Sequence, residues 1–409
     1  MSGILNGMRV VEGSAFVAVP LAGMTLAQMG AEVIRFDRLQ GGLDAGRWPL
    51  APNGQSLFWD GMNKGKKSIA IDMKDPRGKE LITQIITAPG EDAGLFLTNL
   101  RVRGWMDHET LAQHRPDLVS VTLSGDRHGR PQVDYTVNPA LGIPDITGPE
   151  GSSDPTANAL PAWDLIAGNM CVSALLAAER HRLRHGTGQA VDLNLKDVAS
   201  AVIGHLGMIG DATLNAQERG KSGNALYGAY GQDFLCADGN RVMIIGLTSR
   251  QWSGIVKATD TAEQFKKLEM ENNINLQDES IRWQWRHAIT EIIEPWFKIR
   301  AVKDFADDFD KTGLTWSVFR SVKEALNVDP DLTEDNPLFK KILQPDAGEF
   351  LVPRHPANFS KVENSDATPA PALGEHTEEV LGDVLNLSDL EIANLFDDGV
   401  VASSNYNKN

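Results

Sequence analysis

Short apolar runs alternate with longer helical patterns through the first 125 residues of the chain. Runs rich in Val, Ile and Leu indicate strands that are buried on both faces. Between them, residues 20–30 and 76–87 have helical periodicity, and the second of these helices opens with Asp75 and Pro76, a capping residue followed by a first-turn proline. Strands and helices in alternation predict a parallel sheet covered by helices. The predicted strands are 9–12, 31–36, 67–72, 94–99 and 118–124.

The pattern continues to about residue 214 and changes near residue 220. A long helix is predicted from Asp164 to about Gly186, before the change. A glycine-rich stretch then leads into two short apolar runs around Asp238-Gly239, a dipeptide typical of a tight hairpin turn. The other predicted elements are strands over 190–195, 233–236 and 241–246 and helices over 196–214, 279–298, 301–311 and 321–326.

These elements predict a doubly wound, Rossmann-like large α/β domain over residues 1–219 and a smaller α+β domain over residues 220–335. The C-terminal segment, residues 336–409, is expected to return to the large domain. A doubly wound sheet binds its ligands beyond the carboxyl ends of its strands, so the functional site is expected there.

Composition narrows the class of protein. The chain has 409 residues, of which 42% are hydrophobic, and a net charge of −16, which disfavours binding to nucleic acid. Its longest apolar stretch, residues 165–178, is too short to span a membrane. Two cysteines make no disulfide framework, and no basic-then-apolar leader opens the sequence. We therefore expect a cytoplasmic protein that binds neither nucleic acid nor membrane.

Common cofactor signatures are missing. The segment after the first strand, residues 13–20, lacks the G-x-G-x-x-G turn of dinucleotide-binding proteins, so a redox enzyme is disfavoured. The chain also lacks a P-loop and the G-x-S-x-G elbow of hydrolases. His181 and His185 stand four residues apart, but among arginines that would repel a divalent ion. We expect no metal and no permanently bound cofactor.

A group of basic residues lies near the ends of the early strands. In a chain of net charge −16, local positive charge indicates an anionic ligand such as a phosphate or carboxylate. The alternative is a set of ordinary surface cations. The residues are Arg35, Arg38, Arg47, Lys64, Lys66, Lys67 and Lys74.

Asp164 is the only ionisable residue between Pro155 and Ala178. One interpretation is an N-cap of the long helix, and elementary physics favours it, since aspartates at helix starts commonly have this role. The other is a nucleophile. The positive end of the helix dipole would keep the carboxylate ionised while apolar neighbours remove water from it.

Motifs along nearly the whole chain resemble those of the class III CoA-transferase family, which includes carnitine, bile-acid and formyl-CoA transferases. The similar segments are residues 7–12, 20–37, 65–78, 186–197, 239–244 with Gln251-Trp252, and 373–380.

The resemblance implies a catalytic role for Asp164, which matches the family's nucleophilic aspartate. It also implies an interlocked, ring-like homodimer and an acyl-CoA substrate, with coenzyme A bound as part of that substrate. The family's CoA contacts map to Val17, Arg38, Ile71, Lys74, Asn99, Leu100 and Arg103.

Departures from the family pattern point to a branch. Residues 131–138 contain no histidine where the racemase branch has its acid/base partner, which disfavours proton abstraction. Three segments resemble the corresponding segments of enzymes that move CoA between the two carboxyls of mesaconate, a step of the hydroxypropionate cycle. These segments are residues 11–18, 160–164 and 205–209. Arg47, Tyr227 and Gly228 are candidates for binding the free carboxylate or the oxyanion. Intermolecular CoA transfer, or a non-catalytic CoA-binding protein, remain the alternatives.

Overall fold

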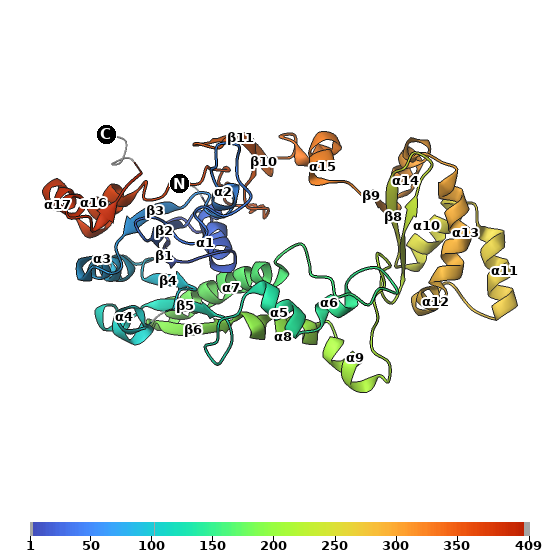
Figure 1. The fold of residues 1–409 in the computed structure, drawn as a ribbon, viewed down its shortest axis with the longest axis horizontal. Helices are drawn as coiled ribbons and strands as arrows, with labels where there is room; N and C mark the ends of the chain where they lie inside the picture. The colour runs from blue at the N-terminus through green and yellow to red at the C-terminus, as the bar shows by residue number, and fades with distance from the viewer. Residues whose placement is uncertain (1–2, 102, 405–409) are drawn as a thin grey trace. The chain divides into compact units, whose positions relative to one another are not determined.

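The computed structural model describes residues 3–101 and 103–404, which form two compact units. The first unit comprises Met1–Leu141, Ala159–Gly210 and Pro330–Asn409, and the second comprises Gly142–Asn158 and Asp211–Asp329 (Figure 1). The unit boundaries at 210/211 and 329/330 lie near the expected domain boundaries at 219/220 and 335/336. Residues 142–158 belong to the second unit, although no pattern in the sequence separates them from the large domain.

The first unit is built on a seven-stranded sheet in the order β12-β3-β2-β1-β4-β5-β6. All neighbouring strands are parallel except β12, which runs antiparallel to β3. The parallel α/β architecture predicted from the alternation is therefore present. The strands are β1 (Arg9–Gly13), β2 (Glu32–Asp37), β3 (Lys67–Ile71), β4 (Leu95–Thr98), β5 (Val119–Ser124), β6 (Gln189–Asn194) and β12 (Val401–Ala402).

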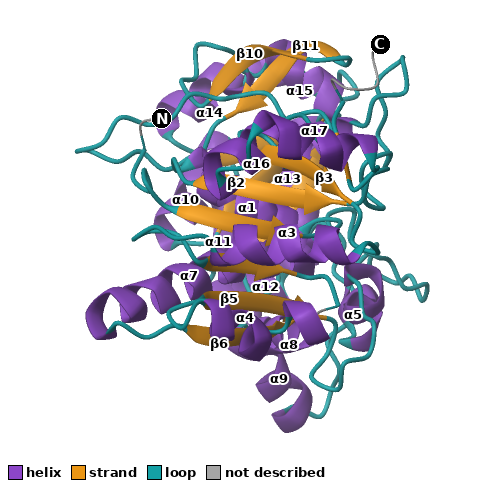
Figure 2. Cartoon of the chain, turned by 90° about the vertical axis from the view of Figure 1, so that its left-hand side faces the viewer, coloured by secondary structure: helices purple, strands orange, loops and turns teal. Residues whose placement is uncertain are grey.

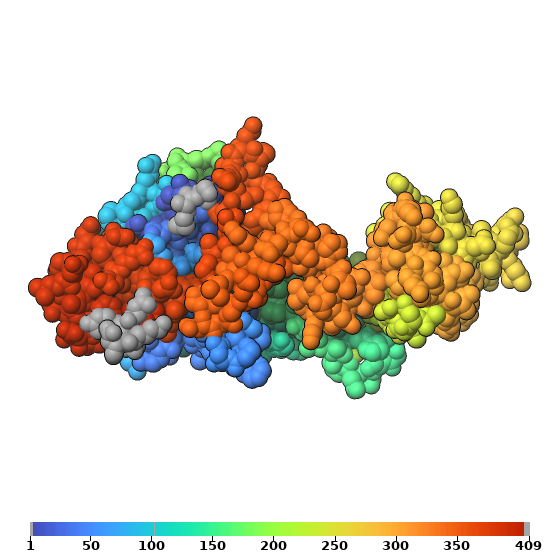
Figure 3. All heavy atoms as spheres, turned by 90° about the horizontal axis from the view of Figure 1, so that it is seen from above, coloured from blue at the N-terminus to red at the C-terminus, as the bar shows by residue number. Residues whose placement is uncertain are grey.

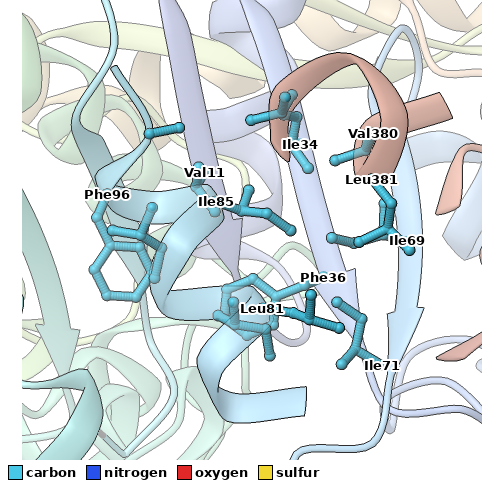
Figure 4. Packing of buried hydrophobic residues seen from close by; sticks show 14 of the residues in the cluster. Val11, Ile34, Phe36, Ile69, Ile71, Leu81, Ile85, Phe96, Val380 and Leu381 are labelled. Atoms are coloured by element: carbon cyan, nitrogen blue, oxygen red, sulfur yellow. The ribbon is translucent and has the colours of Figure 1, made fainter. Parts of the chain in front are cut away.

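Helices cover both faces of this sheet (Figure 2). α1 (Ala18–Gln28) and α7 (Ala162–His185) pack on each other and on the central strands. The other face carries α3 (Pro76–Thr87), α4 (His108–His114) and α16 (Thr377–Leu385), whose apolar side chains form one core with β1–β4 (Figure 4). Phe36 and Phe96 stack in this core with ring centroids 6.4 Å apart.

The C-terminal segment of the first unit packs against its N-terminal half. β10 (Phe339–Gln344) and β11 (Gly348–Pro353) form a hairpin, and α17 (Asp389–Asp397) follows α16. Val401 then pairs with Ile71, which adds β12 to the edge of the sheet. Figure 3 shows this segment, in red, beside the N-terminal part of the same unit, in blue.

The second unit has a three-stranded antiparallel sheet, β7-β8-β9, with an aromatic core. Gly239, at φ +82°, lies in the turn between β7 and β8, where the hairpin was predicted. The bounds are β7 (Tyr230–Leu235), β8 (Arg241–Gly246), β9 (Thr315–Val318), α10 (Ser249–Ala258), α11 (Ala262–Asn272), α12 (Glu279–Gln284), α13 (Arg286–Lys298), α14 (Ala306–Thr312) and α15 (Val322–Val328).

The single helix predicted over residues 196–214 is wrong. The structure has α8 (Leu195–His205) and α9 (Met208–Leu214), separated by Gly207 in the left-handed conformation.

Through residues 3–101 and 103–404, none of the helices combines the length and apolarity that a membrane crossing demands. The remaining helices are α2 (Leu57–Met62), α5 (Asp134–Ala140) and α6 (Ile143–Ile146).

Candidate active site

Asp164 lies in the first turn of α7 and does not cap it. The helix begins at Ala162, and its N-cap position is Pro161, which makes no side-chain cap hydrogen bond. The N-cap interpretation of Asp164 is therefore wrong, because the residue is already inside the helix. Its carboxylate does not cap the helix and is therefore available to react with a substrate.

The helix start is instead capped from α5. Asp134 Oδ2 accepts a hydrogen bond from the backbone N–H of Trp163 at 2.7 Å and from that of Asp164 at 3.3 Å. One turn later, Asn138 Oδ1 accepts the Trp163 indole N–H at 3.0 Å. These contacts satisfy amides that the first turn of an α-helix otherwise leaves unpaired. Neither Asp134 nor Asn138 was predicted as a site residue, although their i, i+4 spacing places them on one helix face.

The surroundings of Asp164 favour its protonated form. Burial raises the pKa of its carboxyl, the negative charge of Asp134 raises it further, and the positive charge of Arg47 lowers it, which gives a value of about 6. Within residues 3–101 and 103–404, no cation lies within ion-pairing distance of Asp164. The expectation that the carboxylate is ionised therefore holds above about pH 6 and not below it. Near neutral pH, Asp164 is therefore a partly desolvated carboxylate without an ion pair in the described residues, which is the state that a nucleophilic role would require.

A close helix crossing places this turn beside the loop between β1 and α1. A Cβ atom on Gly168, one turn after Asp164, would lie 2.6 Å from the carbonyl oxygen of Ala18. Only glycine allows α7 to approach the start of α1 so closely. Val17 is the N-cap residue of α1, so this crossing brings a predicted CoA contact toward the Asp164 turn.

Asn99 holds the same loop from β4. Its side-chain oxygen accepts the Ala15 N–H at 2.9 Å, and its amide donates to the Ala15 carbonyl at 2.8 Å. Val17, Asn99 and Leu100 are thus brought together at the carboxyl ends of β1 and β4. This is the edge at which the sheet was expected to bind its ligand.

The other predicted CoA residues lie at the same edge of the sheet. Arg38 directly follows β2, Lys74 lies in the loop after β3, and Arg103 follows β4, all with exposed side chains. The side chain of Ile71, at the end of β3, is fully buried in the core.

Most of the basic group proposed as an anion site has a structural role. Arg35 binds Asp37 at 2.8 Å and Asp44 at 2.9 Å, and Lys66 binds Glu12 at 2.9 Å. We call these five side chains, all buried, the buried ion cluster.

Two further lysines of the group are not ligand sites of the kind expected. Lys67 binds Glu32 and Glu379 at 2.7 and 2.9 Å. Lys64 is buried, which lowers the pKa of its amine to about 8. Because Lys67 is ion-paired and Lys64 is buried, the interpretation of these residues as part of an anion site is wrong. Arg38, Arg47 and Lys74 are the members whose side chains are exposed.

Arg47 lies in the segment between β2 and α2. Its guanidinium carbon is 5.5 Å from the centroid of the Phe16 ring and 5.2 Å from that of Phe58. Its backbone carbonyl accepts the Ser56 hydroxyl at 2.6 Å. The aromatic rings and the fixed backbone hold an exposed cation whose charge acts on Asp164.

Tyr227 and Gly228 belong to the second unit. The Tyr227 ring lies 3.8 Å below the Arg219 guanidinium carbon and edge-on to Trp283, at 5.0 Å between centroids. Gly228 has φ +81°, which suits the sharp bend of this loop.

Other nucleophiles and ligands are unsuited to chemistry. Burial raises the pKa of the Cys171 thiol to about 12 and that of Cys236 to about 11, so both are packed, inert thiols. Across the part of the chain that the structure describes, no group of three or more His, Cys, Asp or Glu side chains is arranged to hold a metal ion.

Comparison with known proteins adds four findings. CoA-transferase family III matches residues 5–377 of the chain. The 2-methylfumaryl-CoA isomerase of Chloroflexus aurantiacus is 51% identical over 403 residues, which cover 98% of this chain and 98% of that protein. The human succinyl-CoA:glutarate CoA-transferase is 26% identical and covers 97% of this chain and 90% of its own length. A crystal structure of a CAIB/BAIF family protein from Brucella suis shares the fold, with a TM-score of 0.76 at 23% identity over 94% of this chain and 100% of that chain.

Proposed function

The chain belongs to CoA-transferase family III, and from that premise we propose that it is an intramolecular CoA-transferase that converts 2-methylfumaryl-CoA to 3-methylfumaryl-CoA. The observation that carries the proposal is Asp164, a half-buried carboxylate with a pKa of about 6 and no ion pair within the described residues. The 51% identity to a 2-methylfumaryl-CoA isomerase supports the choice of substrate.

The first half of the reaction frees the dicarboxylic acid. Asp164 Oδ attacks the thioester carbonyl carbon, and the C–S bond breaks to give a mixed anhydride and CoA thiolate. The thiolate then attacks Cγ of Asp164. This step forms an aspartyl-CoA thioester and releases methylfumarate with both carboxylates free.

The second half repeats these steps on the other carboxyl. Methylfumarate turns within the site, and its second carboxylate attacks the aspartyl-CoA carbonyl and expels the thiolate. The thiolate attacks the methylfumaryl carbon of the new anhydride and regenerates the Asp164 carboxylate. No proton, electron or cofactor is consumed, so coenzyme A enters and leaves only as part of the substrate.

The remaining predicted residues have roles in binding. The segments that carry Val17, Asn99 and Leu100 would contact the CoA chain near Asp164. Arg38, Lys74 and Arg103 offer exposed cations to its phosphates. Arg47 is proposed to bind the free carboxylate of the substrate. Tyr227 and Gly228 belong to the loop proposed to donate hydrogen bonds to the tetrahedral oxyanions.

We also propose that the enzyme is an interlocked homodimer, in which the small domain of one subunit completes the site of the other. Apolar residues of α8, α9 and the turn between them support a contact surface. Leu206 and Leu214, for example, are 66% and 84% exposed. Mass measurement of the native protein at micromolar concentration tests this, and a monomer would contradict it.

Two free buried cysteines fit the reducing cytoplasm, where we expect the enzyme to act in the hydroxypropionate cycle.

The function is tested by incubating the protein with 2-methylfumaryl-CoA alone and separating the thioesters by chromatography with mass detection. We expect 3-methylfumaryl-CoA to form without added acid. Labelled free methylfumarate (mesaconate), when added, should not be incorporated into the product. Turnover only in the presence of a free dicarboxylic acid would instead establish intermolecular transfer, the activity in the name of the 26% identical human relative.

A further inference from the structure

We propose that Asp134 is a positioning residue for the reaction: its carboxylate fixes the backbone of the Asp164 turn, and its negative charge keeps Asp164 a strong nucleophile. This inference rests on the proposed function only in its assignment of Asp164 as the nucleophile. Its structural basis is the set of contacts between α5 and the first turn of α7.

The contacts form a two-point clamp. Asp134 binds two successive backbone N–H groups, and Asn138 binds the side chain of Trp163, the residue before Asp164. Pro161, at the N-cap position, supplies no acceptor, so the clamp replaces the missing cap. A nucleophile displaced by even a fraction of an ångström loses rate steeply, which makes such a clamp useful in catalysis.

The clamp also has an electrostatic consequence. A serine or asparagine could cap the helix without a charge, yet this chain places a second carboxylate there, 96% buried and without an ion pair in the described part of the chain. Two like charges at close range disfavour ionisation of both. The pKa of Asp134 is itself raised, mainly by its burial.

The charge of Asp134 has a direct effect on reactivity. The nucleophilicity of an anion falls as its pKa falls, a rule established for thiolates. A carboxylate whose pKa is about 6 is more nucleophilic than an ordinary one and is still ionised at neutral pH. Asp134 thereby offsets the opposite influence of Arg47.

The elements packed around α7 explain why Asp134 and Arg47 are the charged residues that shift the pKa of Asp164. Helix α1 and strands β4 and β5, which pack on α7, carry no charged side chain. Groups on the other packed elements are not among those that shift the pKa of Asp164. These groups are Tyr135 on α5, Asp192 on β6, and Lys196, Asp197 and His205 on α8.

Four variants separate the two roles. Asp134→Asn keeps an oxygen that can accept both N–H groups but removes the charge. Asp134→Ala removes both, and Asn138→Ala removes only the contact to Trp163. Glu109→Gln, at an exposed acidic residue of α4, is the control for charge removal.

The first readout is the titration of the Asp164 carboxyl carbon by ¹³C NMR without substrate, assigned by its loss in Asp164→Asn. We expect Asp134→Asn to lower the midpoint by roughly one pH unit. Asn138→Ala and Glu109→Gln should leave it in place. An unchanged midpoint in Asp134→Asn overturns the electrostatic role, whatever the substrate of the enzyme is.

The second readout is kcat against pH with 2-methylfumaryl-CoA. The acidic limb of the Asp134→Asn profile should move with the NMR midpoint, at an unchanged KM. Asp134→Ala should lose roughly ten- to a hundredfold in kcat, much of it restored in Asp134→Asn. Equal kcat in Asp134→Ala and the wild type overturns the positioning role. If Asp134→Ala does not fold, a measurable loss of kcat in Asn138→Ala supports the clamp, and a kcat equal to that of the wild type contradicts it. A wild type without turnover refutes the proposed function and leaves the NMR result standing.

Discussion

Two of the groups of buried or half-buried charged side chains in the first unit are arranged in opposite ways. In the buried ion cluster, two cations face three carboxylates at 2.8–2.9 Å, and all five side chains are buried. At the start of α7, two carboxylates lie together and no cation within the described residues pairs with either. Both groups come from the same sheet and its helices.

The difference separates structural charge from reactive charge. A buried ion pair that is matched and hydrogen-bonded holds segments of the chain together, and it is costly to break. A carboxylate left without a cation keeps its reactivity, because nothing compensates its charge until a substrate arrives. The unpaired group, and not the concentration of basic residues, is therefore the reactive centre that we propose.

The largest effect should come from removing the reactive charge. Asp164→Asn keeps the size of the side chain and removes the nucleophile, so we expect kcat to fall by about 10⁴-fold or more with folding intact. Steady-state assays and circular dichroism of the variant measure both. Activity within tenfold of the wild type would favour the non-catalytic interpretation of Asp164.

Removing the central cation of the buried ion cluster should act on stability instead. Arg35→Met leaves Asp37, Asp44 and Glu12 buried with less compensation, so we expect a loss of about 3–5 kcal/mol in the free energy of unfolding, measured with urea. Lys67→Met, at a half-buried pair, is the control and should cost about 0–1 kcal/mol. Equal losses in the two variants would contradict the structural role of the cluster.

Two helix glycines provide a matched test of both groups. A Cβ at Gly23 would lie 1.7 Å from Glu12 Oε2, and one at Gly168 would lie 2.6 Å from Ala18 O. We expect Gly23→Ala to cost about 1–3 kcal/mol of stability, and Gly168→Ala to lower kcat by roughly ten- to a hundredfold by displacing Asp164. Gly61→Ala, where the Cβ would meet no atom within 4 Å, is the control. A loss of activity in Gly23→Ala without a loss in Gly168→Ala would contradict this assignment of the two groups.

The smallest effect is a pH-dependent gain in stability. The pKa of Asp164 is about 6 in the native state against an ordinary value of 3.8, so its ionised form destabilises the native state above pH 6. Asp164→Asn should therefore have a higher melting temperature than the wild type at pH 8. Its free energy of unfolding should be larger by on the order of 1–2 kcal/mol. The difference should shrink as the pH falls from 8 to 5. A difference that grows toward acidic pH would contradict the raised pKa.

Local patterns predicted most of the sheet, and long-range contacts account for the errors. β1–β5 were identified because their apolar runs are buried on both faces, whereas β12 has two residues and no pattern of its own. Arg35 looks like a surface cation in the sequence because its partner Asp44 is nine positions away in an irregular segment. Asp134 could not be connected with Asp164, since their contact spans thirty residues.

The proposed mechanism requires that the Asp164 carboxyl form a covalent bond, first to the acyl group and then to coenzyme A. The direct measurement is to mix the protein with 2-methylfumaryl-CoA, quench with hydroxylamine and map modified peptides by mass spectrometry. We predict a hydroxamate on Asp164 in the wild type and none in Asp164→Asn or without the thioester. An unmodified Asp164 in a protein that is turning over substrate would rule out covalent catalysis by this residue.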